Sequence, residues 1–459
     1  MPNLEHLPVF IILAVVAVGL QVRSFLSNDK GANGYTEAFR GFQTTYLLIY
    51  GLVVLSDWLQ GPYVYQLYRE YGFTTGEIGQ LFIAGFGASA VCGVFIGSVA
   101  DAFGRKKSAL GFCVAYIISC LTKHVNQYSV LMVGRLTGGI ATSLLFSVFD
   151  AWMVHEHHHR NFPEKDLGDT FAKGNTINGA MAIIAGLIAS FVVAKFGTVA
   201  PFDLSIVVLV LAGVAITIKW TENYGKATAS SSGNSGDSML KELTESFSLM
   251  LERPEIPLVG LMQSFFEGSM YTFVFLWTPA LPENVNHGLV FSCFMVAVML
   301  GSSVFSELSK RGVQPIEILI WVYIVGGTSL MVPALSENPD FRLAAFLLFE
   351  LVCGMYFCSF YTCRGMIVPD KGRATILNIY RVPLNLIVMT VCLLSDKLSQ
   401  QVIFAACVVM LVLGGLCTLQ VASALAEKEK QKVGGTPTSA DRQGSGSEEV
   451  QLTGTTADS

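Results

Sequence analysis

The sequence predicts an all-α membrane protein, and three observations lead to this fold class. Of the 459 residues, 52% are hydrophobic and only 14% are charged, whereas about a quarter of the residues in soluble domains are charged. The apolar residues fall into blocks, most of them long enough to cross a bilayer, which takes roughly 20 residues. Such blocks are too long for β-strands, and lipid admits only helices or closed barrels. The net charge of -5 and the absence of a basic stripe give no support for a nucleic-acid partner.

Thirteen apolar blocks are expected to be transmembrane helices. They cover residues 7–22, 41–62, 76–100, 106–123, 128–152, 172–194, 199–220, 255–279, 286–306, 314–335, 341–362, 374–394 and 400–425. The first block is preceded by Glu5 and His6 rather than by lysine or arginine, and Arg23 follows it. This charge order favours an uncleaved helix whose N-terminus lies outside over the apolar region of a signal peptide.

The positive charges of the short loops predict the orientation of the chain. With Met1 outside, fourteen lysines and arginines lie in inside loops and five lie in outside loops. The inside set is Arg23, Lys30, Arg40, Arg105, Lys106, Lys107, Arg160, Lys165, Lys173, Lys310, Arg311, Arg364, Lys371 and Arg373. Because cytoplasmic loops carry the excess of positive charge, the C-terminus and the central loop are expected in the cytoplasm.

Two polar segments divide the chain. Residues 221–254 carry a Ser/Gly run and then a Lys/Glu-rich stretch, which indicates a cytoplasmic linker with one amphipathic helix over 238–251. Residues 426–459 are too polar to form a core, and we expect a disordered tail. The expected parts are an extra N-terminal helix and loop (1–40), a six-helix half (41–220), the linker (221–254), a second six-helix half (255–425) and the tail (426–459).

The two six-helix sets echo each other weakly. GRLTGGIATSLLFS from Gly134 and FELVCGMYFCSF from Phe349 align Arg135 with Glu350 and Gly139 with Gly354, in corresponding helices of the two sets. A six-helix unit repeated about a central axis is the plan of the major facilitator superfamily.

The sharpest motif is GSVADAFGRKK from Gly97. It resembles the signature G-x-x-x-D-x-x-G-R-[KR]-[KR] between the second and third helices of that superfamily; the alternative is an ordinary tight loop with inside charges. A tight turn requires glycine, here Gly104, and an acid at the membrane edge needs a basic partner. The resemblance implies that Asp101, Arg105 and Asp150 form a latch that holds one conformation.

Five charged residues lie well within apolar blocks: Asp57, Arg135, Glu267, Glu350 and Arg381. Each costs about 2.5–3.5 kcal/mol at the centre of a membrane helix, so each needs a wet cavity or a partner. Two interpretations remain open. The charges line a functional cavity, or they form buried pairs, Asp57 with Arg135 and Glu350 with Arg381, that only fix packing.

Polar and aromatic residues surround these charges. The stretches 57–65 and 263–271, which includes Tyr271, lie in the first helix of each half, and both contain glycine. Bent helices lining a midplane site are typical of secondary carriers.

Arg381 stands between Asn378 and Asn385 beside Pro383, which interrupts the helix hydrogen bonds. A guanidinium fork and two amides suit an oxyanion, although the same arrangement would also satisfy Glu350.

No pattern indicates an enzyme, a metal or a cofactor. The run His155-Glu156-His157-His158-His159 has no second ligand cluster, and a solvated polar run is favoured over a metal site. No catalytic triad, P-loop or dinucleotide fingerprint occurs in the sequence.

Several phrases together resemble the molybdate-anion transporter branch of the major facilitator superfamily, over residues 41–425. They are DWLQGPYVYQLY from Asp57, the Asp101 loop, GRLTGGIATSLLFSVFDAW from Gly134, VAPF from Val199, WTENY from Trp220, QSFFEGSMYTFVFLWTPAL from Gln263 and NIYRVPLN from Asn378. The resemblance implies two six-helix halves plus the extra helix, and high-affinity molybdate uptake across the plasma membrane by alternating access.

The residues themselves are compatible with this function. Arg135 and Arg381 are expected to neutralise the dianion, and Asn378, Asn385 and Tyr271 to contact its oxygens. Asp57, Glu267 and Glu350 are pairing acids or carry a coupling proton. The expected binding partners are the oxyanion substrate and the lipid bilayer, and the protein is expected to be a monomer. Two alternatives remain: a carrier of sulfate, a sugar or an organic anion, and a non-transporting receptor that keeps the carrier fold.

Overall fold

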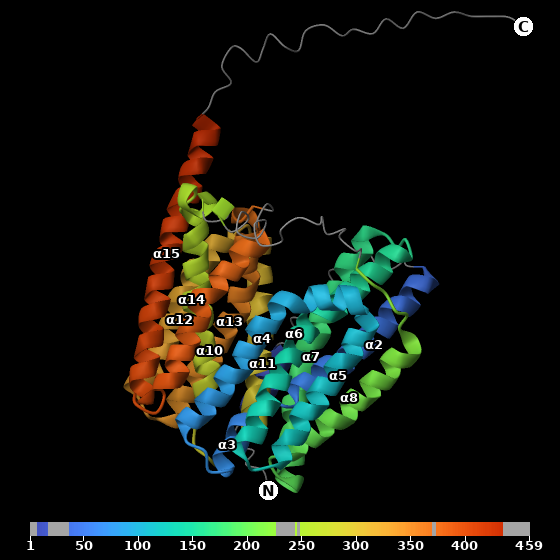
Figure 1. Cartoon of the computed structure of the whole chain (residues 1–459). Coiled ribbons are helices and arrows are strands. Elements are labelled where there is room, and N and C mark those ends of the chain that lie inside the picture. Colours follow the sequence, from blue (N-terminus) through green and yellow to red (C-terminus); the bar gives the residue numbers. More distant parts are fainter. Residues whose placement is uncertain (1–6, 17–35, 226–243, 246–247, 370–372, 435–459) are drawn as a thin grey trace, which may run out of the picture.

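The computed structural model describes residues 7–16, 36–225, 244–245, 248–369 and 373–434, and no β-strand occurs among them. The first half of the bundle contains α2 (Glu37–Trp58), α3 (Val64–Glu70), α4 (Thr75–Phe103), α5 (Arg105–Leu121), the 3-10 turn η2 (Thr122–His124), α6 (Tyr128–His159), α7 (Glu164–Phe196) and α8 (Ala200–Lys219). The second half contains α10 (Glu255–Ala280), α11 (His287–Lys310), α12 (Pro315–Leu335), α13 (Pro339–Ile367), α14 (Arg373–Leu394) and α15 (Gln400–Gly434) (Figure 1).

The predicted membrane fold is confirmed. Within the described part of the chain, ten helices are long and apolar enough to cross a bilayer. α5, with 17 residues, and the more polar α10 are not among them. Both nevertheless pack against helices that are: α5 against α6 and α8, and α10 against α14 and α15. The protein is therefore a multi-pass membrane protein.

The two halves pair their helices in the same way. In the first half, α6 packs on α4 and α5, and α8 packs on α2 and α5; in the second, α13 packs on α11 and α12, and α15 packs on α10 and α12. Gly139 and Gly354, which the sequence aligned, have the same structural role in the two halves. A Cβ at Gly139 would lie 2.3 Å from the Gly85 carbonyl oxygen, and one at Gly354 would lie 2.0 Å from the Val298 carbonyl oxygen. Each glycine lets two helix backbones touch.

The halves are joined near α3. We call this side of the bundle the α3 end, and the opposite side, where α4 turns into α5, the Arg105 end. At the α3 end, the Tyr63 hydroxyl donates to Asn286 Oδ1 (3.3 Å) and the Gly76 N–H donates to Asp396 Oδ1 (2.5 Å). Toward the Arg105 end, the helices of the first half lean away from the second (Figure 1).

The expected extra helix is described over Leu7–Val16. Phe10 and Leu13 pack against Val296 and Leu300 of α11, the same two residues that Ile183 of α7 packs against, so this helix lies against the second half beside the contact between α7 and α11. Residues 17–22 of the predicted span, Arg23, Lys30, Lys371, most of the linker and the end of the tail lie outside the described residues.

Several helices extend beyond their predicted ends, and three of these extensions correct predictions. α15 continues to Gly434, so residues 426–434 are helical and do not belong to the expected disordered tail. α6 continues to His159, and His157 is fully buried against Phe39 and Phe162, so the His-rich run is not a wholly solvated face. α13 continues to Ile367, so Arg364 belongs to its last turn rather than to a loop. Apolar blocks mark the hydrocarbon-spanning part of a helix and not its ends.

Candidate functional site

A polar cluster surrounds Glu267 in the second half. Glu267 lies on α10 with only 6% of its surface exposed. Its carboxylate accepts a hydrogen bond from Gln263 Nε2, one turn earlier, at 3.3 Å, and one from the Tyr356 hydroxyl of α13 at 3.4 Å. The Tyr356 ring is held by stacking on Phe266, with ring centroids 3.7 Å apart. Neutral donors thus hold this acid in place inside the bundle.

Two guanidinium groups belong to the electrostatic surroundings of the same carboxylate. Arg364 on α13 and Arg381 on α14 both contribute to the field at Glu267 and at the Tyr361 hydroxyl, and neither forms an ion pair with Glu267 among the described residues. The Arg364 guanidinium lies over the Tyr361 ring, 4.5 Å from its centroid, which fixes its orientation. Tyr361 is 45% exposed and Arg381 is exposed, so the arginine side of this group of residues is not covered by other parts of the described chain.

Small residues on α10 bring α14, and with it Arg381, close to Glu267. A Cβ at Gly260 would lie 2.3 Å from the Tyr380 ring, and a Cβ at Gly268 would lie 2.9 Å from Ile387. Side chains at these two positions would push α14 outward. The position of Arg381 therefore depends on glycines that flank Glu267 in the sequence.

Arg135, the other expected anion-binding arginine, lies against α4. Its Nε donates to the Leu81 carbonyl oxygen at 3.0 Å, and its guanidinium lies over the Phe82 ring, 4.6 Å from the centroid. Gly85 leaves room for it, because a Cβ there would lie 2.8 Å from an Arg135 nitrogen. Arg135 thus has partners within the first half.

A row of aromatic rings connects the two arginine regions. Phe82 contacts Phe86 (6.0 Å between centroids), and Phe86 meets Tyr271 of α10 edge-on (5.4 Å). The charges of Glu267 and Arg381 reach the Tyr271 hydroxyl. Tyr271 therefore belongs to the Glu267 cluster and marks its border with the first half.

Neither ion pair considered from the sequence occurs among the described residues. The carboxylate of Asp57 accepts a hydrogen bond from the Tyr116 hydroxyl, whose oxygen also lies 3.1 Å from Thr142 Oγ1. Glu350 is 8% exposed and has no hydrogen-bond or ion-pair partner in the part of the chain that the structure describes. The interpretation of these charges as closed packing pairs is therefore wrong.

Of the two asparagines beside Arg381, only Asn385 has a side chain among the described residues. The side chain of Asn378 lies outside the described residues. Asn385 is half-buried on α14, one turn beyond Arg381.

The expected latch is assembled only in part. Arg105 binds Asp101 through Nε (2.9 Å) and a terminal nitrogen (2.7 Å). Asp150 instead accepts a hydrogen bond from the Tyr46 hydroxyl at 3.2 Å. No neighbour lies within 4 Å of a Cβ placed at Gly97.

Glu222 is a site residue that the sequence did not indicate. Its carboxylate accepts hydrogen bonds from the backbone N–H groups of Lys106 (2.8 Å) and Lys107 (3.3 Å), and so caps the N-terminus of α5. Gly104, at φ 106°, makes this possible, because a Cβ there would lie 2.6 Å from that carboxylate.

The segment that carries Glu222 is itself anchored. Trp220 stacks on Trp152 with ring centroids 3.8 Å apart and planes 3° from parallel. Trp152 Nε1 donates to the Thr221 carbonyl oxygen at 2.9 Å. The phrase WTENY was visible in the sequence, but nothing local to it indicates a cap for α5.

The arrangement can bind an anion but offers no catalytic group. Arg364 and Arg381 carry two positive charges and Glu267 one negative charge, so the cluster has one positive charge in excess. Arginine forks suit tetrahedral oxyanions, and tyrosine hydroxyls supply further donors. No group of three or more His, Cys, Asp or Glu side chains among the described residues could hold a metal ion.

The comparisons with known proteins agree on a transporter. A family model described as sugar transporters with 12 transmembrane segments matches residues 6–344. A molybdate-anion transporter of Xenopus laevis is 37% identical over 400 residues, which cover 84% of this chain and 86% of that protein. One of Takifugu rubripes is 34% identical and covers 82% of this chain and 84% of its own.

Solved structures of low sequence identity share the fold. A mutant of the nucleoside transporter NupG superposes with a TM-score of 0.68 at 11% identity, over 83% of this chain and 99% of its own. A D-xylose-proton symporter superposes with a TM-score of 0.62 at 14% identity, over 83% and 97%. The chain is a membrane transporter, not an enzyme, and it belongs to the molybdate-anion transporter branch of the major facilitator superfamily.

Proposed function

We propose that this protein takes up molybdate with high affinity by alternating access, and that the Glu267 cluster is the binding site. Arg381 and Arg364 bind the oxyanion, Tyr271 and Tyr361 donate to its oxygens, and Glu267 balances the charge when the site is empty. Asn385 and Asn378 lie on the same helix as Arg381 and complete the set of donors.

The observation that carries the proposal is the meeting of two arginine-bearing helices at one enclosed carboxylate: Tyr356 of α13 donates to Glu267, Arg364 lies over Tyr361 of the same helix, and Gly260 and Gly268 bring α14 with Arg381 close to α10. Two arginines with no acid paired to them in the described part of the chain suit an anion better than a neutral sugar, so the cluster favours an anion over the sugars named in the family description. The relatives reported above are named molybdate-anion transporters, which supports molybdate among the tetrahedral dianions. Asp57, Glu350 and Arg135 lie outside the cluster and have supporting roles.

Alternating access is supported by where the halves touch. Their hydrogen bonds gather at the α3 end, while Arg381 and Tyr361 are exposed. Such an arrangement corresponds to a carrier closed on one side of its site. In the proposed orientation the Arg105 end faces the cytoplasm of a plasma-membrane protein, with the N-terminus outside and Asp101, Arg105 and Asp150 acting as the latch.

The test is uptake of radiolabelled molybdate at nanomolar concentration by cells lacking their own molybdate carriers. Excess sulfate is the competitor, Arg381→Ala is the test variant and Arg311→Ala the matched control. Arg311 is 70% exposed in an ion pair with Glu307 at the same end of the protein. We expect saturable uptake that sulfate does not suppress, loss of uptake in Arg381→Ala and normal uptake in the control.

Other outcomes distinguish the alternatives. Suppression by sulfate identifies a general dianion carrier. Uptake of a labelled hexose instead of molybdate supports a sugar carrier. If correctly inserted protein transports neither molybdate nor the hexose, the result supports the alternative that the protein is a receptor. Molybdate uptake that survives Arg381→Ala supports the proposed transport function but contradicts the assignment of Arg381 to the binding site.

A further inference from the structure

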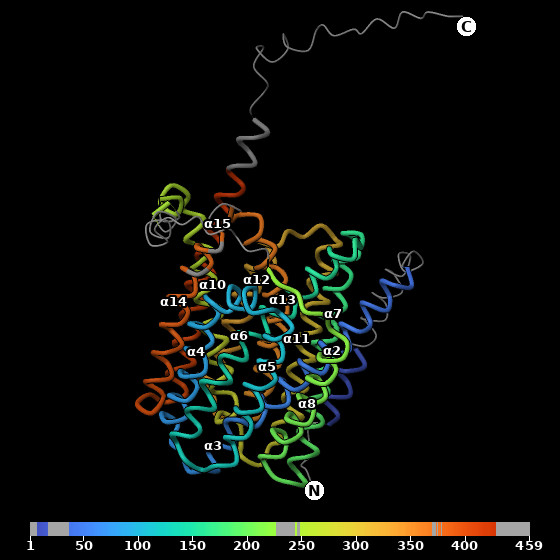
Figure 2. The backbone as a smooth tube through the Cα atoms, turned by 45° about the vertical axis from the view of Figure 1, so that its right-hand side comes forward, coloured from blue at the N-terminus to red at the C-terminus, as the bar shows by residue number. Residues whose placement is uncertain are grey.

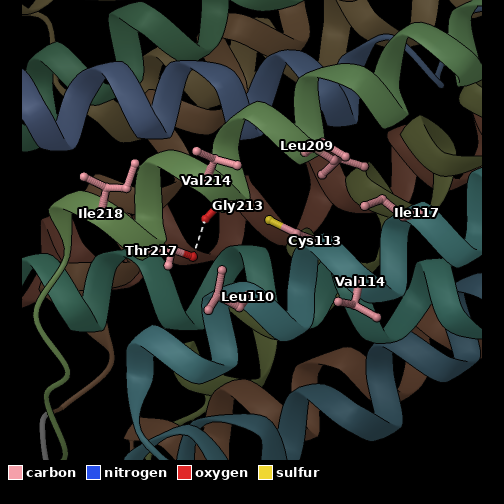
Figure 3. Close-up of a pocket in the computed structure, with 10 residues that line it drawn as sticks. Leu110, Cys113, Val114, Ile117, Leu209, Gly213, Val214, Thr217 and Ile218 are labelled. Carbon is pink, nitrogen blue, oxygen red and sulfur yellow. Dashed lines mark hydrogen bonds between the residues drawn. The ribbon is translucent and has the colours of Figure 1, made fainter.

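An apolar groove runs between α5 and α8 on the outer surface of the first half. It has a volume of about 340 Å³ and is lined by Leu110, Cys113, Val114 and Ile117 of α5 and by a stretch of α8 that includes Gly213 and Thr217 (Figure 3). Both overall views show α5 and α8 side by side at the edge of the bundle (Figure 2). The groove is separate from the Glu267 cluster, which lies in the other half.

The groove exists because small residues face each other across it. A Cβ at Gly213 would find its nearest neighbours, atoms of Cys113 and Leu110, at 3.9 Å, so the two helices leave room for further carbon atoms. Its rim is exposed and apolar: Val114 is 56% exposed, Val214 52% and Ile218 71%. In a protein that spans a bilayer, this surface faces hydrocarbon.

Positive charge is concentrated at one end of the groove. At its Arg105 end, Lys106 Nζ donates to the carbonyl oxygen of the lining residue Thr217 at 2.9 Å, and Lys107 and Lys219 are exposed nearby. Both acids in this region already have partners: Glu222 accepts from the N–H groups of Lys106 and Lys107, and Asp101 binds Arg105. Lys106, Lys107, Lys219 and Arg105 against these two acids leave an excess of positive charge at this mouth.

The opposite end of α8 lacks this excess of positive charge. Asp203, in the first turn of α8, binds His124 at 2.7 Å, and Lys123 in the same region is buried. An occupant with an apolar chain and an anionic head is therefore favoured with its head at the Arg105 end of the groove.

We propose that the α5–α8 groove is a binding site for an anionic phospholipid, with one acyl chain along Gly213 and Cys113 and the phosphate at Lys106 and Lys219. The apolar lining holds the chain regardless of headgroup, and the lysines select the anionic headgroup. Each lysine near an anionic lipid contributes on the order of a fivefold preference.

The test uses the purified full chain, with bound lipid counted by native mass spectrometry after titration with phosphatidylglycerol or phosphatidylcholine. Gly213→Leu fills the groove, and Val207→Leu is its control, because Val207 is 55% exposed on α8 but does not line the groove. Lys106→Gln combined with Lys219→Gln removes the headgroup contacts, and Lys195→Gln at the α3 end is the charge control.

We expect the wild type to retain one phosphatidylglycerol in preference to phosphatidylcholine. Gly213→Leu should lose that lipid, the lysine double variant should lose the preference by more than about tenfold, and both controls should behave like the wild type. Val214→Phe at the groove rim repeats the filling test if Gly213→Leu does not fold.

Three results would overturn the proposal. The first is equal retention of the lipid by the filled variants. The second is a wild type that does not distinguish the two headgroups. The third is a dimer that the filled variants abolish, which would mean that a second copy, not a lipid, covers the groove.

Discussion

Replacing Arg364 by glutamine tests whether the Glu267 cluster binds the transported anion. The substitution keeps a long polar side chain and removes one of the two positive charges of the Glu267 cluster, the one that lies over the Tyr361 ring. The two remaining charges then cancel, and a dianion would meet a neutral site. Arg364 was counted from the sequence as a loop residue, so its involvement depends on the structure alone.

The size of the effect follows from the contact that is lost. A hydrogen bond to a charged group contributes roughly 1.5–3 kcal/mol, and 1.4 kcal/mol corresponds to a tenfold change in affinity. We therefore expect molybdate binding to weaken by about 10- to 150-fold. The affinity of Arg364→Lys for molybdate should lie between those of the wild type and Arg364→Gln. Lysine keeps the charge but loses the planar fork that lies over Tyr361.

The assay is equilibrium binding of radiolabelled molybdate to purified protein, with uptake measured in parallel. Arg311→Gln is the control for a charge lost at the same end of the protein. Unchanged binding by correctly folded Arg364→Gln would refute the assignment. An equal loss in Arg311→Gln would show that general surface charge, rather than the cluster, attracts the anion.

Three further predictions concern single positions. Glu267→Gln removes the only negative charge of the cluster, so molybdate should bind about fivefold or more tightly in the same binding assay; weaker binding would contradict the charge balance. Gly139→Ala should lower thermal stability by about 1–3 kcal/mol, because its Cβ would lie 2.3 Å from the Gly85 carbonyl oxygen, whereas Gly97→Ala, with open space around it, should not. Glu222→Gln should lower the free energy of unfolding by about 1 kcal/mol, because it weakens the cap of α5. An unchanged melting temperature would argue against that cap.

Hydropathy was sufficient to predict the fold because the bilayer requires long apolar helices. It placed each span but not the helix ends, since α6 and α13 continue as helices after their apolar residues stop. The alignment of Gly139 with Gly354 succeeded because close backbone contact admits only glycine, which leaves a trace in the sequence.

The partners of the buried charges could not be predicted in the same way. Charge arithmetic suggested that Asp57 and Arg135 pair, yet Asp57 accepts from a tyrosine hydroxyl and Arg135 donates to a backbone carbonyl. A helix sequence does not give the rotation of one helix against another, and a neutral donor satisfies an acid as well as an arginine does. Glu222 was missed because it caps a helix through an N–H group that lies 116 residues earlier in the chain.

The stacked indoles of Trp152 and Trp220 have a consequence for how this protein can be observed. Two parallel chromophores 3.8 Å apart share their excited state, and the sequence holds only five tryptophans. The pair sits where the last helix of the first half gives way to the linker. Its near-ultraviolet circular dichroism is therefore a built-in optical signal for the junction, readable without an added dye, and it disappears when either indole turns away.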